Sequence, residues 1–335
     1  MVDTKTRFST TSERLKAALI FHQVLYFHQV LYYWKHGGVS STILRHFVFC
    51  MFQWLSQMVS YKTGAIWALS ISLSVSVSLV RAHEYWLDPI SSSIVRGSSA
   101  IVDIRNGENF SGAAFPYDGD LYQSISITSA SGVEQYTGRL GDYPAIHPEL
   151  QSDGIHSIAV DTKPKLLVYD SWQKFTTFLN YHGINDVAQR HVHLGLPKTE
   201  IKERYIRSAK TIIRVNDQET QSAEKISIDR NDIRKAMEPT NAVFELVLLD
   251  DPYGDRSTVR SKLLFKGKPL VDRQVELFWR GTQSIRLTTK TDENGVATFK
   301  ILGNGDYMLN AVQVVEPESS DVHWLSYWAS ITFER

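Results

Sequence analysis

The chain has 335 residues, one cysteine and equal numbers of basic and acidic side chains, 36 of each. This length predicts about two or three domains, and zero net charge argues against a nucleic-acid partner, because such proteins usually carry a basic excess. One cysteine excludes a disulfide scaffold and a cysteine-rich zinc module.

The zero charge is the sum of two unlike pieces. Residues 1–82 carry eight basic and two acidic side chains, a formal charge of +6, and residues 83–335 carry the balancing −6. The first piece also holds the cysteine, Cys50. The sequence therefore raises the question of whether both pieces belong to the mature protein.

Residues 58–82 have the composition of a secretory signal peptide. Lys62 precedes an uncharged stretch over residues 65–80, and the small side chains of Val80 and Ala82 suit a cleavage site. A buried strand or a membrane anchor is the alternative, but about 16 apolar residues are fewer than the roughly 20 that span a bilayer. We expect cleavage after Ala82 and an exported, periplasmic protein that begins at His83.

Residues 1–57 precede this signal and contain a direct repeat of Phe-His-Gln-Val-Leu-Tyr at 21–26 and 27–32. A membrane hairpin or a histidine-rich metal tract would be functional interpretations. Signal peptides normally start at the N-terminus, so we interpret residues 1–57 as an upstream extension that is not part of the native protein.

Residues 83–240 are expected to form a β domain that contains a helical insertion. Residues 121–128 and 154–161 alternate apolar and polar side chains, which is typical of half-buried strands. The insertion lies at about 170–213, where 170–180 and 199–213 have helical spacing of apolar residues. Residues 216–240 are polar and are expected to be a loop.

Residues 241–335 are expected to form a second, transthyretin-like or Ig-like β-sandwich. About seven short strands alternate with turns such as Asp292-Glu-Asn-Gly295. The predicted fold class is therefore mainly β, with two β-sandwich-like domains and a helical insertion between them.

Four ordered motifs resemble a known family. They are His83-Glu-Tyr-Trp-Leu-Asp-Pro89, Gly154-Ile-His156, Glu203-Arg-Tyr-Ile-Arg-Ser-Ala-Lys210 and Trp324-Leu-Ser-Tyr-Trp-Ala-Ser-Ile-Thr-Phe-Glu334. Over residues 83–335 the chain resembles the NikM-like exported bacterial proteins, and Gly267–Ala311 resembles a transthyretin-like or carboxypeptidase-regulatory sandwich. The resemblance implies a periplasmic component of nickel or cobalt uptake, with a membrane transporter as partner.

His83 is the leading candidate metal ligand. As the first mature residue it would offer its α-amine and its ring Nδ1 as a chelating pair. Nitrogen-rich tetragonal sites of this kind suit Cu(II) or Ni(II), so the chemistry allows copper beside the nickel or cobalt that the resemblance implies.

Three further histidines are candidate metal ligands. His156 lies in the Gly-Ile-His motif of an expected strand, and on a strand His191 and His193 would face the same side and could chelate together. A satisfied core histidine is the alternative for His156, and solvated loop histidines are the alternative for the pair.

Three functions remain open. The main hypothesis is an exported, non-enzymatic metal-binding or metal-delivery protein, and the alternative is a structural or carbohydrate-binding β-sandwich module of the cell envelope. A copper oxidative enzyme that uses the N-terminal histidine is a further alternative. The sequence contains no Gly-x-Ser-x-Gly elbow and no phosphate-binding glycine loop, which argues against hydrolase and nucleotide chemistry.

Overall fold

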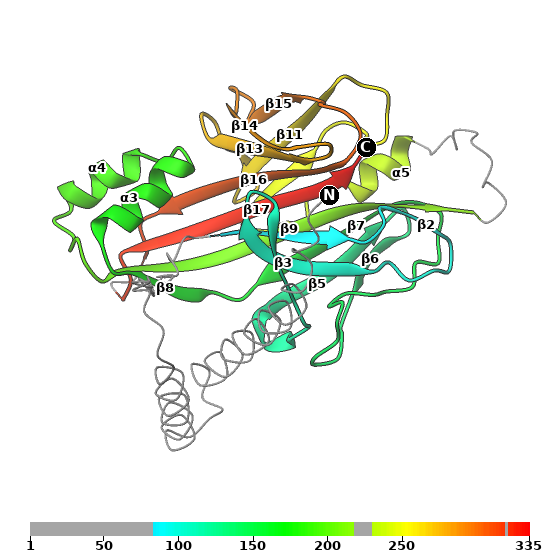
Figure 1. The fold of residues 1–335 in the computed structure, drawn as a ribbon, viewed down its shortest axis with the longest axis horizontal. Helices are drawn as coiled ribbons and strands as arrows, with labels where there is room; N and C mark the ends of the chain where they lie inside the picture. Colours follow the sequence, from blue (N-terminus) through cyan, green and yellow to red (C-terminus); the bar gives the residue numbers. More distant parts are fainter. Residues whose placement is uncertain (1–82, 218–229, 319–320) are drawn as a thin grey trace, which may run out of the picture. The chain divides into compact units, whose positions relative to one another are not determined.

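The computed structural model describes residues 83–217, 230–318 and 321–335, and these residues belong to one compact unit (Figure 1). The expected signal peptide at 58–82 and the expected extension at 1–57 lie outside the described residues. Within the described ranges, no helix is both long enough and apolar enough to cross a membrane.

A large sheet of ten strands forms the centre of the fold. Its strand order is β14-β13-β16-β17-β9-β7-β5-β6, and the short strands β2 and β8 also pair with β9. Neighbouring strands are antiparallel except that β9 runs parallel to β17 and to β2. The bounds are β2 Ser93–Val95, β5 Tyr122–Ser129, β6 Gly132–Gln135, β7 Gly154–Thr162, β8 Lys165–Tyr169, β9 Ile201–Asn216, β13 Gln274–Arg280, β14 Ser284–Lys290, β16 Asp306–Val315 and β17 Trp324–Glu334.

Two small sheets cover opposite faces of the large sheet. The N-terminal small sheet consists of β1 (Glu84–Pro89), β3 (Val102–Glu108) and β4 (Ser111–Phe115), and the C-terminal small sheet consists of β10 (Phe244–Leu248), β11 (Thr258–Phe265), β12 (Lys268–Pro269) and β15 (Val296–Lys300). Alternation along β17 shows the two faces. Ala329 and Ile331 belong to the core under the C-terminal small sheet, whereas the Ser330 hydroxyl donates to the Tyr85 carbonyl on β1. The expected mainly-β, sandwich-like fold is confirmed.

The helical part is shorter than the sequence predicts. Helix α3 (Trp172–Tyr181) begins after Ser171, whose hydroxyl accepts from the Lys174 amide, and it buries Phe175 and Leu179. Helix α4 (Asp186–His193) follows, and both helices lie at the end of the large sheet where β17 begins (Figure 1).

The predicted helix over residues 199–213 is wrong, because this segment forms strand β9. The strand is buried on both faces, so apolar residues occur at even and odd positions. Ile212 packs in the core under the C-terminal small sheet, and Ala209 and Ile213 pack under the N-terminal small sheet. A two-sided apolar pattern therefore imitates helical spacing, while the β-branched isoleucines favour the strand.

The polar segment 216–240, expected to be a loop, contains the short helix α5 (Arg230–Ala236), whose Ile233 and Ala236 are buried in the core. The large sheet also continues across the predicted domain boundary at residue 240, because β17 pairs with β9. This boundary therefore does not coincide with a break between sheets.

A buried ion pair attaches β9 to the C-terminal small sheet. The Lys210 ammonium donates to the Glu245 carboxylate and, at 3.4 Å, to the Leu246 carbonyl. The Lys210 and Glu245 side chains are 6% and 1% exposed, whereas those of the pair Lys290–Asp272 are 61% and 75% exposed. The two lysines therefore make a matched comparison.

We expect Lys210→Met to lower the free energy of unfolding by about 3–5 kcal/mol, because it leaves the Glu245 charge buried without its partner. Lys290→Met should cost about 0–1 kcal/mol, because an exposed pair is screened by water. Urea denaturation of both variants measures the difference. Equal losses in the two variants would contradict the structural role of Lys210.

Candidate functional site

His83 lies just before β1 and is partly exposed. Its ring Nδ1 is 3.4 Å from the Glu108 carboxylate at the end of β3, and the two side chains are 39% and 38% exposed. The Arg207 guanidinium donates to the His83 backbone carbonyl at 3.2 Å. His83 is therefore at the surface, beside a carboxylate that is a second donor of the kind metals use.

His156 is buried on β7, away from His83. Its Nε2 is 3.1 Å from the Ser152 hydroxyl, and burial lowers the pKa of the ring. His156 pairs with Ile213 of β9, and His83 contacts Arg207 of the same strand. Six residues of strand separate those two positions, a distance of about 20 Å, so the two histidines do not share a coordination sphere.

His191 and His193 lie on helix α4 and not on the strand that their proposed chelation requires. Two residues that are two positions apart on an α-helix are rotated about 200° around the helix axis. Their side chains therefore lie on nearly opposite sides of the helix, and the two rings do not converge. The Trp324 indole donates to His191 Nδ1 at 2.9 Å, and His191 Nε2 in turn donates to the Pro197 carbonyl at 2.9 Å. Buried His191 is thus a core histidine with both nitrogens in use, and His193 is exposed.

The four predicted histidines do not fit a single metal site. Within the part of the chain that the structure describes, no group of three or more histidine, cysteine, aspartate or glutamate side chains is arranged to hold a metal ion. The side chains of His83 and Glu108 provide two donor groups.

A polar pocket of about 400 Å³ opens where one end of the N-terminal small sheet meets the large sheet. Its lining includes four carboxylates, two guanidinium groups and a few apolar side chains. The lining residues are Asp88, Pro89, Ile90, Ser92, Asp103, Arg105, Phe110, Arg280, Asp306, Thr332, Phe333 and Glu334.

Strand pairing places these charged side chains together. Asp88 of β1 lies opposite Asp103 of β3, and on the large sheet Asp306 of β16 lies between Arg280 of β13 and Glu334 of β17. The charges therefore collect at strand ends, where the sequence changes from apolar to polar residues.

Hydroxyl groups of β17 hold β1 against the large sheet. The Thr332 hydroxyl donates to the Leu87 carbonyl at 2.7 Å, and the Ser330 hydroxyl donates to the Tyr85 carbonyl at 2.7 Å. Both hydroxyls are buried, and such satisfied contacts fix the packing distance of the two layers. They position Asp88, one residue after Leu87, at the pocket wall.

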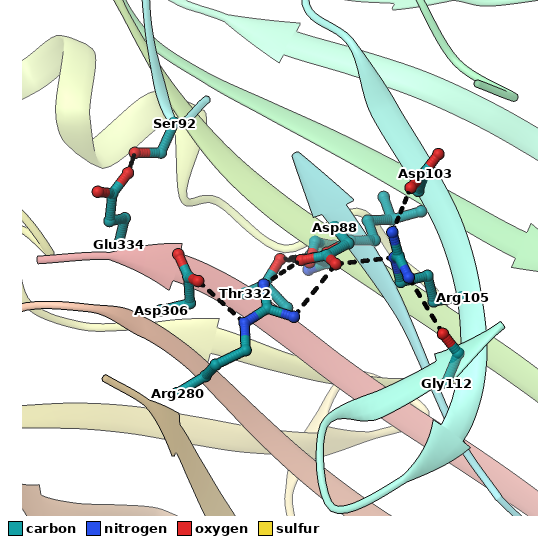
Figure 2. Close-up of polar contacts among 11 residues, drawn as sticks. Asp88, Ser92, Asp103, Arg105, Gly112, Arg280, Asp306, Thr332 and Glu334 are labelled. Carbon is teal, nitrogen blue, oxygen red and sulfur yellow. Dashed lines mark hydrogen bonds and ion pairs between the residues drawn. The ribbon is translucent and has the colours of Figure 1, made fainter. Parts of the chain in front are cut away.

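Asp88 joins the two guanidinium groups (Figure 2). Arg280 donates to Asp88 from Nη2 at 2.7 Å and from Nη1 at 3.3 Å, and donates from Nε to Asp306 at 3.0 Å. Arg105 lies 2.8 Å from Asp88 through Nε and donates to Asp103 at 2.6 Å. Each guanidinium is thus already compensated by two carboxylates.

The pocket electrostatics follow from this arrangement. Burial alone would lower the pKa of Arg280, but Asp88 and Asp306 more than offset it, so the guanidinium stays charged. Burial raises the pKa of Asp306; Arg280 opposes the rise, and Glu334 and Asp88 add to it. The Asp306 carboxylate therefore holds its proton more tightly than an ordinary aspartate does, because it is partly buried and lies near other carboxylates.

A second set of charges is buried between β1, α3 and β13. His182 Nδ1 lies 2.9 Å from Glu276, which also accepts from Arg286 at 2.8 Å and Asn310 at 2.8 Å. Burial alone would raise the pKa of Glu276, but His182, Arg286 and Asn310 together lower it to about 2. These partners leave Glu276 as a charged anchor of the core.

Glu84 of the His83-Glu-Tyr-Trp motif lies near this network. It accepts from the Asn109 amide at 3.1 Å and from the Tyr181 hydroxyl at 3.3 Å. Burial, together with repulsion from Glu276, raises its pKa to about 7. A glutamate that titrates near neutrality links this network to pH.

The aromatic residues of the C-terminal motif do not form an exposed stacking surface. Trp324, Tyr327, Trp328 and Phe333 are all buried in β17. These buried rings therefore offer no surface on which a carbohydrate could stack.

The sequence interpretation missed the pocket residues. Asp88 belongs to a quoted motif, but its partner Arg280 is 192 positions away. The sequence does show charged residues at the ends of expected strands, such as Arg280 and Asp306. No regular spacing along the chain indicates that these residues meet in space.

Comparison with known proteins gives one family. Residues 80–315 match the "Domain of unknown function (DUF4198)", so the chain belongs to this family. The match supports neither the NikM-like name nor a separate transthyretin-like unit, and both stay predictions. No curated protein matches the chain.

Two solved structures show weak similarity. The "D0-D1 domain of Intimin" is 11% identical, with a TM-score of 0.16, over 74% of this chain and 96% of that one. A "tetra-tandem repeat in extending region of large adhesion protein" is 10% identical, with a TM-score of 0.17, over 74% of this chain and 48% of that one. At these TM-scores neither similarity carries an argument about function.

Glu84 gives a pH prediction. Its raised pKa means that the folded state holds the proton more tightly, so its contribution to stability is present below about pH 4.5 and is lost as the pH rises to about 7. The loss is at most about 3 kcal/mol. Glu84→Gln cannot titrate, so between these pH values it should lose less stability than the unaltered protein.

The control is Glu293→Gln, in an exposed turn. Burial also raises the pKa of Glu203 to about 7, so both variants retain that slope and only the difference between them reports Glu84. Denaturation at the two pH values gives this difference. Parallel pH profiles for the two variants would show that Glu84 does not titrate as described.

Proposed function

We propose that the chain is an exported, non-catalytic binding module of the cell envelope and that its ligand site is the Asp88–Arg280 pocket. The signal-like residues 58–82 support export. The pocket supports binding, because a concave site with a few convergent polar groups is the usual form of a small-molecule site.

The observation that carries the non-catalytic part is the pairing of the charged groups in the pocket. Among the described residues that line it there is no histidine, cysteine or lysine. The Ser92 hydroxyl donates to Glu334, and the Thr332 hydroxyl donates to a backbone carbonyl. A hydroxyl or thiol nucleophile is usually activated by an adjacent base such as histidine, and the lining offers no histidine for that role, which supports binding over nucleophilic catalysis by a hydroxyl.

The experiment uses the purified exported protein and a panel of amines, sugars, amino acids and organic acids. We expect at least one class to raise the melting temperature and to be recovered chemically unchanged. Ile90→Trp should weaken that binding about tenfold. Ile90 lines the pocket and is 71% exposed, so the larger indole side chain would narrow the entrance to the pocket.

Val133→Trp is the matched control, because Val133 is 65% exposed and does not line the pocket. Equal effects of the two tryptophans would remove the pocket from the proposal. Conversion of a bound compound, seen by mass spectrometry, would contradict a non-catalytic role.

Metal delivery is a second candidate, and the position of His83 favours it. A partly exposed histidine beside Glu108, with an α-amine freed by cleavage after Ala82, would give a small set of nitrogen and oxygen donors. Reversible binding of nickel or cobalt, or of copper, is the chemistry such a set would supply.

The metal candidate is tested on exported protein whose first residue is shown to be His83 by mass spectrometry. We expect Ni(II), Co(II) or Cu(II) to bind by calorimetry, and His83→Ala to weaken binding about tenfold or more. His193→Ala, on the exposed end of α4, is the control. A form that retains one methionine before His83 should also bind weakly, since its α-amine is displaced. Unchanged binding in both altered forms would exclude His83 as a ligand.

A further inference from the structure

The charge of the pocket identifies the kind of ligand that suits it. Four carboxylates against two guanidinium groups give the lining a formal charge of −2. Arg280 is held by Asp88 and Asp306, and Arg105 is held by Asp88 and Asp103. The guanidinium charges are thus already compensated, and an anionic ligand would meet a net negative wall.

Two of the carboxylates repel each other by construction. Asp306 and Glu334 are directly opposite on neighbouring antiparallel strands, and like charges in that position destabilise a sheet. Arg280 contacts Asp306, and the Ser92 hydroxyl donates to Glu334. A carboxylate offers about four lone-pair sites, so both groups keep acceptor capacity beyond these contacts. A positively charged hydrogen-bond donor would relieve the repulsion and use that capacity.

The shape and the apolar lining favour an organic cation over a metal ion. A pocket of about 400 Å³ is far larger than an ion, and Pro89, Ile90 and Phe110 add apolar surface beside the charges. Across the residues that the structure describes, no set of three or more carboxylate, histidine or cysteine side chains is arranged to hold a metal ion. A ligand with an alkyl chain and positively charged ends would place the chain on the apolar surface and the charges beside the carboxylates.

We propose that this pocket binds a small organic dication of the alkyl diamine class, with one ammonium group at the Asp306–Glu334 pair. This inference rests on the proposed binding function and specifies its ligand. The negative charge selects a cation, the apolar lining selects a carbon chain, and the charge of −2 selects two ammonium groups.

The test is calorimetric titration of the purified exported protein with diaminobutane at low and high salt. We expect binding that weakens at high salt, because salt screens charges that are partly open to solvent. Butanediol, of the same length and without charge, should not bind. Asp306→Asn and Glu334→Gln should each weaken diaminobutane binding about tenfold, because each removes a charge-assisted hydrogen bond.

Asp272→Asn is the matched control, since Asp272 pairs with Lys290 at the exposed surface and does not line the pocket. Glu334 is exposed, so Glu334→Gln is expected to fold even if Asp306→Asn does not. Absence of diaminobutane binding, equal binding of butanediol, or unchanged binding in Glu334→Gln overturns the dication. If another class from the panel binds and Ile90→Trp weakens that binding, the proposed function stands without this inference; if no compound binds, both fail.

Discussion

The fold depends on one constraint, which is that β9 is buried on both faces. Polar groups on such a strand must find partners inside the protein, because burial of an uncompensated charge is costly. Glu203 accepts from Tyr169 and Ser326, Lys210 pairs with Glu245, and the Arg207 guanidinium lies over the Tyr85 ring of β1 at 5.4 Å. These contacts join β9 to both small sheets, to β8 and to β17, so the three layers are fixed relative to one strand.

The pocket is a consequence of that layering. Because β17 lies beside β9, its Ser330 and Thr332 hydroxyls face β1 and hold it across the large sheet. The last residues of β1 then meet the ends of β13, β16 and β17. Charged residues that would be solvated at the end of an isolated strand are brought into a shared concave wall, where Asp88 orders two guanidinium groups.

The sequence predicted the strands in which polar and apolar side chains alternate, and it failed at β9, where they do not. Residues 121–128 and 154–161 alternate, and they are strands β5 and β7, although β7 is buried almost throughout. Residues 199–213 have no such alternation, and the structure there is β9. Helix α3 was predictable because Ser171 and the spacing of Phe175 and Leu179 are local signals. The pocket was not predictable, since Asp88 and Arg280 meet only through tertiary packing.

Histidine was a poor guide to the candidate site for a physical reason. A neutral imidazole has one donor and one acceptor nitrogen, so it fits a dry core when both are used, as in His191 between Trp324 and Pro197. Carboxylates resist such burial and collect where they can keep a cationic partner. The charge of −6 over residues 83–335 was therefore the more useful signal, and the pocket carries −2 of it. The amino-acid composition shows the excess of negative charge. Only the structure, in which four strand ends meet, shows where part of that charge is concentrated enough to select a ligand.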